Sequence, residues 1–369
     1  MIFTLFKGIL KYSLTVSSCL LICLVVASSL IWIYQKLLKN KNRYKDSIKT
    51  FISASFLILL TYSPVIRSHY VFNDDYYLWI WQKGVCYTHP EYLFIFSIGR
   101  PIANIFLCPL WSMVDSLESA NLARLVAVLL TAITFFVINR FLIHLKFKII
   151  FSYFIPLIIV TSFSFQVYNS WIMAAYIPSG IIFSILSIFL AIKLIESIEN
   201  KEKHLKLIET IKLLGNKRFR LFYILSIVLY ILTLSTYQPS AGFFTCFAAI
   251  YILKRKEIGV ASLRFMTAVF GSIFLVSNLV YFSILKAFIL ILSYDKFIPT
   301  YDPRVLRFIF DPSFITGKLI WFLKGPFLNS ANILNIENRS LSAIFLIVLG
   351  VSLIILYLED IKHIANTIK

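Results

Sequence analysis

The feature that most constrains this chain is a succession of apolar runs, most of them close to the length that crosses a bilayer. A transmembrane helix needs about 20 consecutive apolar residues. The composition agrees, because 59% of the residues are hydrophobic and 14% are charged, against roughly 45–50% and 25% in soluble domains. We therefore expect an all-α, polytopic transmembrane protein in which residues 1–369 form a single integral membrane domain. About nine spans are predicted, at residues 12–34, 51–67, 120–142, 149–166, 177–195, 220–236, 240–253, 262–285 and 340–358.

Two prolines bear on the shape of these spans. Pro156 lies within the fourth run, where it removes a helix hydrogen bond and predicts a kink. Pro239 lies between the sixth and seventh runs, and a helix rarely continues through such a position. We expect 220–236 and 240–253 to pair as a hairpin that turns at Gln238-Pro239.

The distribution of basic residues predicts the direction of the spans. The net charge is +19, from 36 Lys and Arg against 17 Asp and Glu. In a chain this apolar, the excess indicates the positive-inside rule and contact with anionic membrane lipids, and it does not indicate nucleic acid. The strongly basic loops all lie in the cytoplasm if the N-terminus is outside and the C-terminus inside. These loops are 36–49, 139–148, 193–220 and 253–264.

Residues 92–114 decide this topology. The run is apolar, but Gly99-Arg100-Pro101 and Pro109 interrupt it. If it crossed the membrane, the later basic loops would change sides and the charge bias would largely vanish, so we expect a helix that lies at the outer interface. Three extracytoplasmic segments follow, at 68–119, 167–176 and 286–339.

Asp74 and Asp75 are the first candidates for chemistry, a few residues beyond the second run. Two adjacent carboxylates beside anionic headgroups repel each other, and they are tolerated where they bind a cation or move a proton. One of them can serve as a general base for a sugar hydroxyl, and the pair can bind a divalent cation such as Mg²⁺ or Mn²⁺. The alternative is structural, because these residues also suit the N-cap of a helix that starts at Tyr76.

Arg100 is the second candidate. An arginine in an apolar interfacial helix costs free energy unless it is paired or close to the interface. Its planar guanidinium can grip a phosphate with two hydrogen bonds, and a polyprenyl phosphate lies at that depth of the membrane. The alternative is that the side chain only reaches toward lipid headgroups.

Further candidates for substrate binding are Tyr237 and Gln238 at the outer hairpin tip, and Arg304 and Arg307 in the third outer segment. Amide and aromatic groups suit sugar hydroxyls and ring faces, but a membrane-interface tyrosine and a polar turn have the same pattern. The two arginines can meet a lipid phosphate or belong to an amphipathic interfacial helix. The same ambiguity applies to Tyr168, Asn169, Trp171 and Tyr176 in the second outer segment.

Several other activities lack their motifs. The chain has no GxxxxGK[ST] loop for a nucleotide, no HExxH and no GxSxG. Charged residues within the predicted spans are few, which argues against an ion-coupled pump.

The sequence resembles the GtrII-type O-antigen glucosyltransferase family, multi-span bacterial enzymes of the GT-C class. The resemblance covers roughly residues 50–250 and depends on short motifs. These are Asn73-Asp74-Asp75-Tyr76, the Trp79/Trp81 stretch, Gly99-Arg100 and Tyr237-Gln238-Pro239. The chain departs from the family in being short, in an additional run at 12–34 and in its C-terminal third.

The resemblance implies a GT-C-like glycosyltransferase of the bacterial inner membrane with its active site on the extracytoplasmic face. Such enzymes move a sugar, glucose in this family, from undecaprenyl phosphate to a lipid-linked O-antigen. Asp74 or Asp75 then matches the catalytic base, and Arg100 holds the donor phosphate. Two alternatives stay open: an O-antigen or capsule polymerase that works through the arginines of 286–339, and a polysaccharide flippase or transporter.

Overall fold

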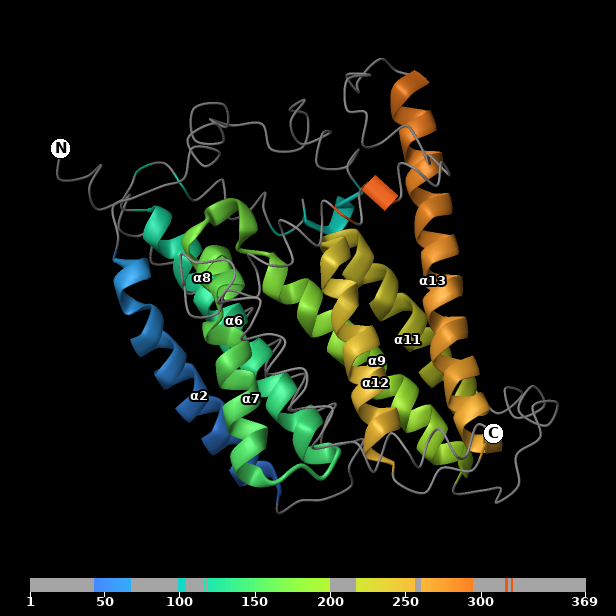
Figure 1. The fold of residues 1–369 in the computed structure, drawn as a ribbon. Coiled ribbons are helices and arrows are strands. Elements are labelled where there is room, and N and C mark those ends of the chain that lie inside the picture. Colours follow the sequence, from blue (N-terminus) through green and yellow to red (C-terminus); the bar gives the residue numbers. More distant parts are fainter. Residues whose placement is uncertain are drawn as a thin grey trace. The chain divides into compact units, whose positions relative to one another are not determined.

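The computed structural model describes residues 43–67, 99–103, 106, 114, 116, 119–199, 217–255, 260–294, 316–317 and 320 (Figure 1). Within these residues every regular element is helical and no strand occurs, in agreement with the all-α prediction. The α-helices are α2 (Arg43–Ile66), α6 (Ala120–His144), α7 (Ile149–Thr161), α8 (Phe163–Ser170), α9 (Ile177–Glu199), α11 (Lys217–Thr236), α12 (Gly242–Lys254) and α13 (Val260–Tyr294). Two short 3-10 turns accompany them, η1 (Ile172–Ala174) and η2 (Gln238–Ala241).

Four of the described helices are long and apolar enough to cross a membrane, and these indicate a membrane protein. They are Ala120–His144, Ile177–Ile198, Phe219–Thr236 and Ser262–Ala287. A fifth crossing results if the bent pair Ile149–Thr161 and Ser164–Ser170 forms one span. The apolar part of α2, Thr50–Ile66, and the 13-residue α12 are shorter than such a span. The predicted runs 12–34 and 340–358 lie outside the described residues, so the count of nine stays a prediction.

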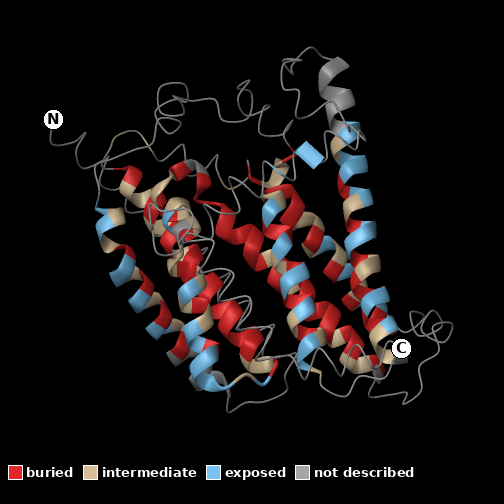
Figure 2. Ribbon diagram, in the orientation of Figure 1, coloured by how far each residue is buried: buried red, intermediate tan, exposed pale blue. Residues whose placement is uncertain are grey.

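Several helices carry exposed positions along their length (Figure 2), and many of these are large hydrophobic side chains, as expected where lipid surrounds a protein. On α2, Ile52, Phe56 and Leu60 are 61%, 65% and 55% exposed. These residues follow one another at intervals of four, so they share one face of the helix. On α13, Leu279 is 68% exposed.

The chain divides into two compact units. Unit 1 comprises Met1–Thr161, Phe165–Ile185 and Leu232–Ser240, and unit 2 comprises Ser162–Ser164, Leu186–Ile231 and Ala241–Lys369.

In unit 1, α6 runs antiparallel to α2. Phe51 near the start of α2 packs edge-to-face on Phe136 in the second half of α6, with 5.5 Å between ring centroids. The segment between Ile66 and Ala120 therefore begins and ends at the same end of unit 1, and Ala103 packs in the same apolar cluster as Ala120. This is the arrangement that a non-spanning 92–114 segment requires.

The helix α7 continues through Pro156, and the 58° bend of this part of the chain lies after Thr161. Because Pro156 has no N–H, the carbonyl of Ser152 loses its helical partner. Asn139 of α6 replaces it, since its Nδ2 donates to the Ser152 carbonyl over 2.8 Å. This side-chain hydrogen bond explains why the proline is accommodated within the helix.

The bend itself is also stabilised by side chains. The hydroxyl of Tyr62 donates to the carbonyl of Val160 in the last turn of α7, where helix carbonyls have no partner within the helix. On α8, the buried Asn169 donates to Phe165 O over 2.7 Å and accepts from Thr131 of α6 over 3.0 Å. These bonds tie α2, α6, α7 and α8 together, so α8 has a defined position.

In unit 2, the last part of α9 packs with α11, α12 and α13. Ser187 and Ser226 each donate to the other's backbone carbonyl, over 2.7 Å and 2.8 Å. Tyr230 of α11 packs edge-to-face on Phe244 of α12 at 4.9 Å. The chain passes from α11 to α12 through η2, so the predicted hairpin turn at Gln238-Pro239 is confirmed.

Candidate functional site

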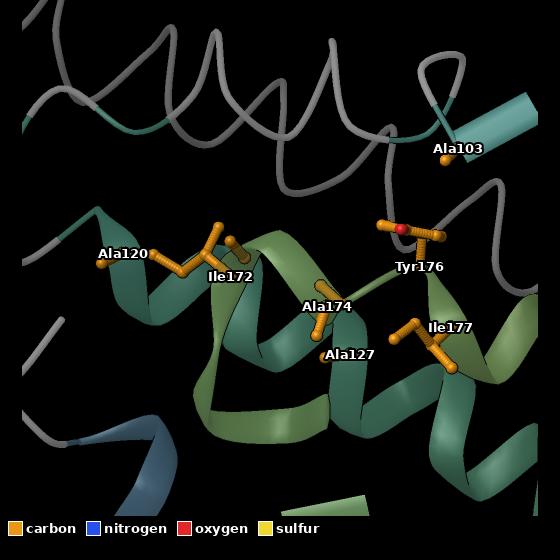
Figure 3. Close-up of a cluster of buried hydrophobic side chains, with 9 residues drawn as sticks. Ala103, Ala120, Ala127, Ile172, Ala174, Tyr176 and Ile177 are labelled. Atoms are coloured by element: carbon orange, nitrogen blue, oxygen red, sulfur yellow. The ribbon is translucent and has the colours of Figure 1, made fainter. Parts of the chain in front are cut away.

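The candidate site lies at the end of unit 1 where α6 and α9 begin. A cluster of small and apolar side chains is buried there, including Ala103, Ala120 and Tyr176 (Figure 3). Partly buried aromatic side chains pack against this cluster, namely Phe106, Tyr168, Trp171 and Tyr237. The end of the bundle therefore carries an aromatic wall on a closely packed base.

Arg100 lies against this aromatic wall and is partly buried. Its Nε donates to Gln238 Oε1 and its Nη1 donates to the Tyr176 hydroxyl, both over 3.4 Å. The ring of Tyr237 lies 4.8 Å from the guanidinium carbon, which is cation–π geometry. Segments that are far apart in the sequence thus meet around one guanidinium.

All of these partners of Arg100 are neutral. Among the residues that the structure describes, the one ion pair is Lys193 with Glu196 on α9, at 3.0 Å. No described acidic side chain neutralises Arg100. A partly buried guanidinium that keeps its charge attracts an anion.

The backbone before Arg100 has a special conformation. Gly99 has φ 84°, in the left-handed region that favours glycine. Gln238 Nε2 donates to the Gly99 carbonyl over 3.1 Å, and Pro101 begins a short helical stretch through Ala103. The glycine and the proline together fix the direction in which the Arg100 side chain leaves the backbone.

Tyr176 of the buried cluster and Tyr237 of the aromatic wall both contact Arg100. Tyr176 is 3% exposed. Burial raises the pKa of the Tyr176 hydroxyl above its ordinary value, and the nearby positive charge of Arg100 acts in the opposite direction. The Tyr176 hydroxyl is therefore protonated at neutral pH. Tyr168 of α8 packs edge-to-face on Tyr237, with 6.5 Å between ring centroids.

A close approach of backbones positions the turn that carries Gln238. A Cβ added at Gly180 of α9 would lie 3.2 Å from Ser240 Oγ and 3.4 Å from Thr236 Cβ. A side chain at residue 180 would therefore require Ser240 or Thr236 to shift by a few tenths of an ångström, so Gly180 favours the close packing of η2 on the start of α9.

Two buried arginines lie near the two ends of the candidate span on α6. Arg124 is 1% exposed and Arg140 is 7% exposed, and both lie within the candidate span Ala120–His144. Arg124 Nε donates to Ser170 O over 3.2 Å and Nη1 donates to Asn121 Oδ1 over 3.3 Å. Arg140 lies over the ring of Phe136 at 5.3 Å. The sequence signal that could have identified these arginines is that each lies near one end of an apolar run.

The sequence-predicted site residues have different outcomes. Arg100, Tyr237 and Gln238 come together, although 92–114 and the hairpin tip are far apart in the chain. Tyr176 and Tyr168 join them, from the second predicted outer segment. The remaining predicted residues, Asp74, Asp75, Arg304 and Arg307, lie outside the described residues.

The predicted divalent-cation site at Asp74 and Asp75 lies outside the described residues as well. Within the part of the chain that the structure describes, no group of three or more His, Cys, Asp or Glu side chains could hold a metal ion. The described part of the site is thus aromatic and cationic, which suits an anion with an organic ring.

No protein-family model, no curated protein and no solved structure matches this chain.

Proposed function

We propose that this protein is a membrane glycosyltransferase that uses a polyprenyl-phosphate sugar as donor, with Arg100 holding the donor phosphate. The observation that carries the proposal is the Arg100 guanidinium, which is held by the neutral side chains of Gln238, Tyr176 and Tyr237 and has no acidic partner among the described residues. The resemblance of the short motifs to the GtrII-type family supports the same reading.

The chemistry follows from what a phosphate leaving group needs. The hydroxyl of a lipid-linked glycan acceptor attacks the anomeric carbon of the donor sugar, and the bond from that carbon to the phosphate oxygen breaks. The electron pair leaves with the polyprenyl phosphate, whose added negative charge a guanidinium stabilises. The acceptor proton passes to a carboxylate, a role that we assign to Asp74 or Asp75.

The aromatic wall suits the sugar part of such a donor. The ring of Tyr237 lies beside Arg100 and Tyr168 packs on Tyr237, and aromatic rings can pack against the apolar C–H faces of a sugar. The proposed sugar is glucose and the proposed acceptor a lipid-linked O-antigen, outside the inner membrane.

The test is sugar transfer from a polyprenyl-phosphate glucose donor in membranes that contain Arg100 variants. Arg100→Ala should reduce transfer roughly ten- to a hundredfold, the value of a hydrogen bond to a charged group, with an unchanged protein level. Arg100→Lys should reduce it less, because it keeps the charge but not the planar fork. The matched control is Arg67→Ala, since Arg67 is an exposed arginine just after α2 in the same unit.

Full activity of Arg100→Ala would show that this side chain only contacts headgroups. A deletion strain separates the rival functions. Loss of a side-branch sugar from the surface glycan supports a glycosyltransferase, whereas loss of chain length supports a polymerase that works through Arg304 and Arg307. An unchanged glycan contradicts both.

A further inference from the structure

Gln238 uses both polar atoms of its side chain on one short segment of the chain. Its Oε1 accepts from Arg100 Nε over 3.4 Å, and its Nε2 donates to Gly99 O over 3.1 Å. Only the amide nitrogen can donate and the amide oxygen accept. The two bonds therefore admit a single orientation of the amide, and they link residues 138 and 139 positions apart in the sequence.

These contacts constrain the guanidinium from several directions. Gln238 lies along its Nε edge, Tyr176 at one Nη1 hydrogen, and the ring of Tyr237 covers a face. The N–H groups of Nη2 have no partner among the described residues. They lie at the forked end of the guanidinium, which is the end that binds phosphate oxygens.

The sequence suggested that Gln238 binds substrate, but its bonds describe a different role. We propose that Gln238 is the positioning residue of the Arg100 phosphate site, which fixes the guanidinium for the phosphate and does not contact the ligand. The inference rests on the proposed function of Arg100. A flexible arginine loses conformational freedom when it binds, and an arginine that is already held loses less. Gln238 thus increases phosphate affinity through Arg100.

The experiment measures binding of farnesyl phosphate to the purified full-length chain in detergent, with farnesol as the uncharged probe. Gln238→Leu removes both hydrogen bonds at similar size, and farnesyl phosphate affinity should fall roughly tenfold, the lower range for a bond to a charged group. Farnesol affinity should stay the same. The matched control is Gln166→Leu, which removes an exposed glutamine of unit 1 that bonds to Thr161 O.

A double-mutant cycle distinguishes positioning through Arg100 from a purely structural role, because it measures the coupling of Gln238 and Arg100 in farnesyl phosphate affinity. If Gln238 acts through Arg100, then Gln238→Leu should cause no further loss of farnesyl phosphate affinity in an Arg100→Ala background. If Gln238 contacts the ligand itself, the two losses should add. Additive losses therefore overturn the proposal.

Gln238→Glu provides a second variant, which keeps the length of the side chain. Its carboxylate can accept from Arg100 but cannot donate to the Gly99 carbonyl, and it neutralises the guanidinium. Farnesyl phosphate affinity should fall at least as far as in Gln238→Leu, and wild-type affinity in Gln238→Glu would contradict the proposal.

Failure of the inference and failure of the proposed function give different results. If Arg100→Ala lowers farnesyl phosphate affinity and neither Gln238 variant does, the positioning role is wrong and the phosphate site stands. If Arg100→Ala keeps wild-type affinity, the phosphate site itself is wrong, and the positioning role is wrong with it. Inorganic phosphate competing as well as farnesyl phosphate would identify a general anion site in place of a lipid-phosphate site.

Discussion

Gly99 shows how one backbone conformation can control the candidate site. Its φ of 84° costs a residue with a side chain about 1–2 kcal/mol. Gly99→Ala should therefore lower the free energy of unfolding by roughly that amount. It should also weaken the Gln238 bond to the Gly99 carbonyl, so sugar transfer should fall together with the melting temperature.

Gly242→Ala is the matched control for this prediction. Gly242 begins α12, and a Cβ there would meet nothing within 4 Å. Alanine favours a helix over glycine by roughly 0.5–1 kcal/mol, so this variant should melt at the same or a higher temperature. An unchanged melting temperature in Gly99→Ala would show that residue 99 tolerates a side chain in its native conformation.

At Asp74 and Asp75, replacement by asparagine separates the two interpretations that the sequence leaves open. Asparagine caps a helix as well as aspartate does, but it cannot take a proton from an acceptor hydroxyl. Loss of a general base costs about 10²–10⁴ in rate. We expect one of the two Asp→Asn variants, with Asp74 favoured, to lose transfer at a normal protein level. Normal transfer in both single variants and in the double variant would place the base elsewhere.

At the scale of a helix, Asn139 and Pro156 are connected through the Ser152 carbonyl, and a double-mutant cycle tests this connection. Asn139→Leu leaves the buried Ser152 carbonyl without its donor, which should cost about 1–3 kcal/mol. Pro156→Ala restores a backbone N–H at the position that faces this carbonyl within α7. The cost of Asn139→Leu should therefore be smaller in a Pro156→Ala background, as measured by thermal unfolding of the four proteins. Equal costs in both backgrounds would show that the asparagine does not compensate for the proline.

The helices also show what the sequence could and could not predict. The apolar runs predicted α6, α9, α11 and α13, because burial in lipid requires long apolar helices. The kink at Pro156 stays a prediction, and the structure adds two features that the sequence did not predict: a 58° bend after Thr161 and an Asn139 side chain that compensates for the hydrogen bond lost at the proline. That compensation depends on a neighbour in space, which a local pattern does not contain.

At the scale of the whole molecule, the sequence predicted which residues belong to the candidate site but not how they contact one another. The sequence identified Arg100, Tyr237 and Gln238 as polar or aromatic residues at predicted outer ends. Their mutual contacts depend on how α9 and η2 pack. The role of Gln238 changed for this reason, because its partners are protein groups and no motif records them. Buried Arg124 was missed because an apolar average over a run conceals a single charge.

The topology of the whole molecule is the last prediction, and three reporter fusions test it, of which the pair at Thr88 and Asn200 decides whether 92–114 spans. If 92–114 does not span, Thr88 and Asn200 lie on opposite sides of the membrane, since three crossings separate them. If it spans, a fourth crossing puts both outside. The antiparallel arrangement of α2 and α6 favours the first outcome. We therefore expect a periplasmic signal at Thr88 and cytoplasmic signals at Asn200 and at Lys45, from alkaline phosphatase and fluorescent-protein fusions. A cytoplasmic Thr88 would reverse the bundle and separate Arg100 from any donor presented outside, so the proposed phosphate site would fail together with the topology.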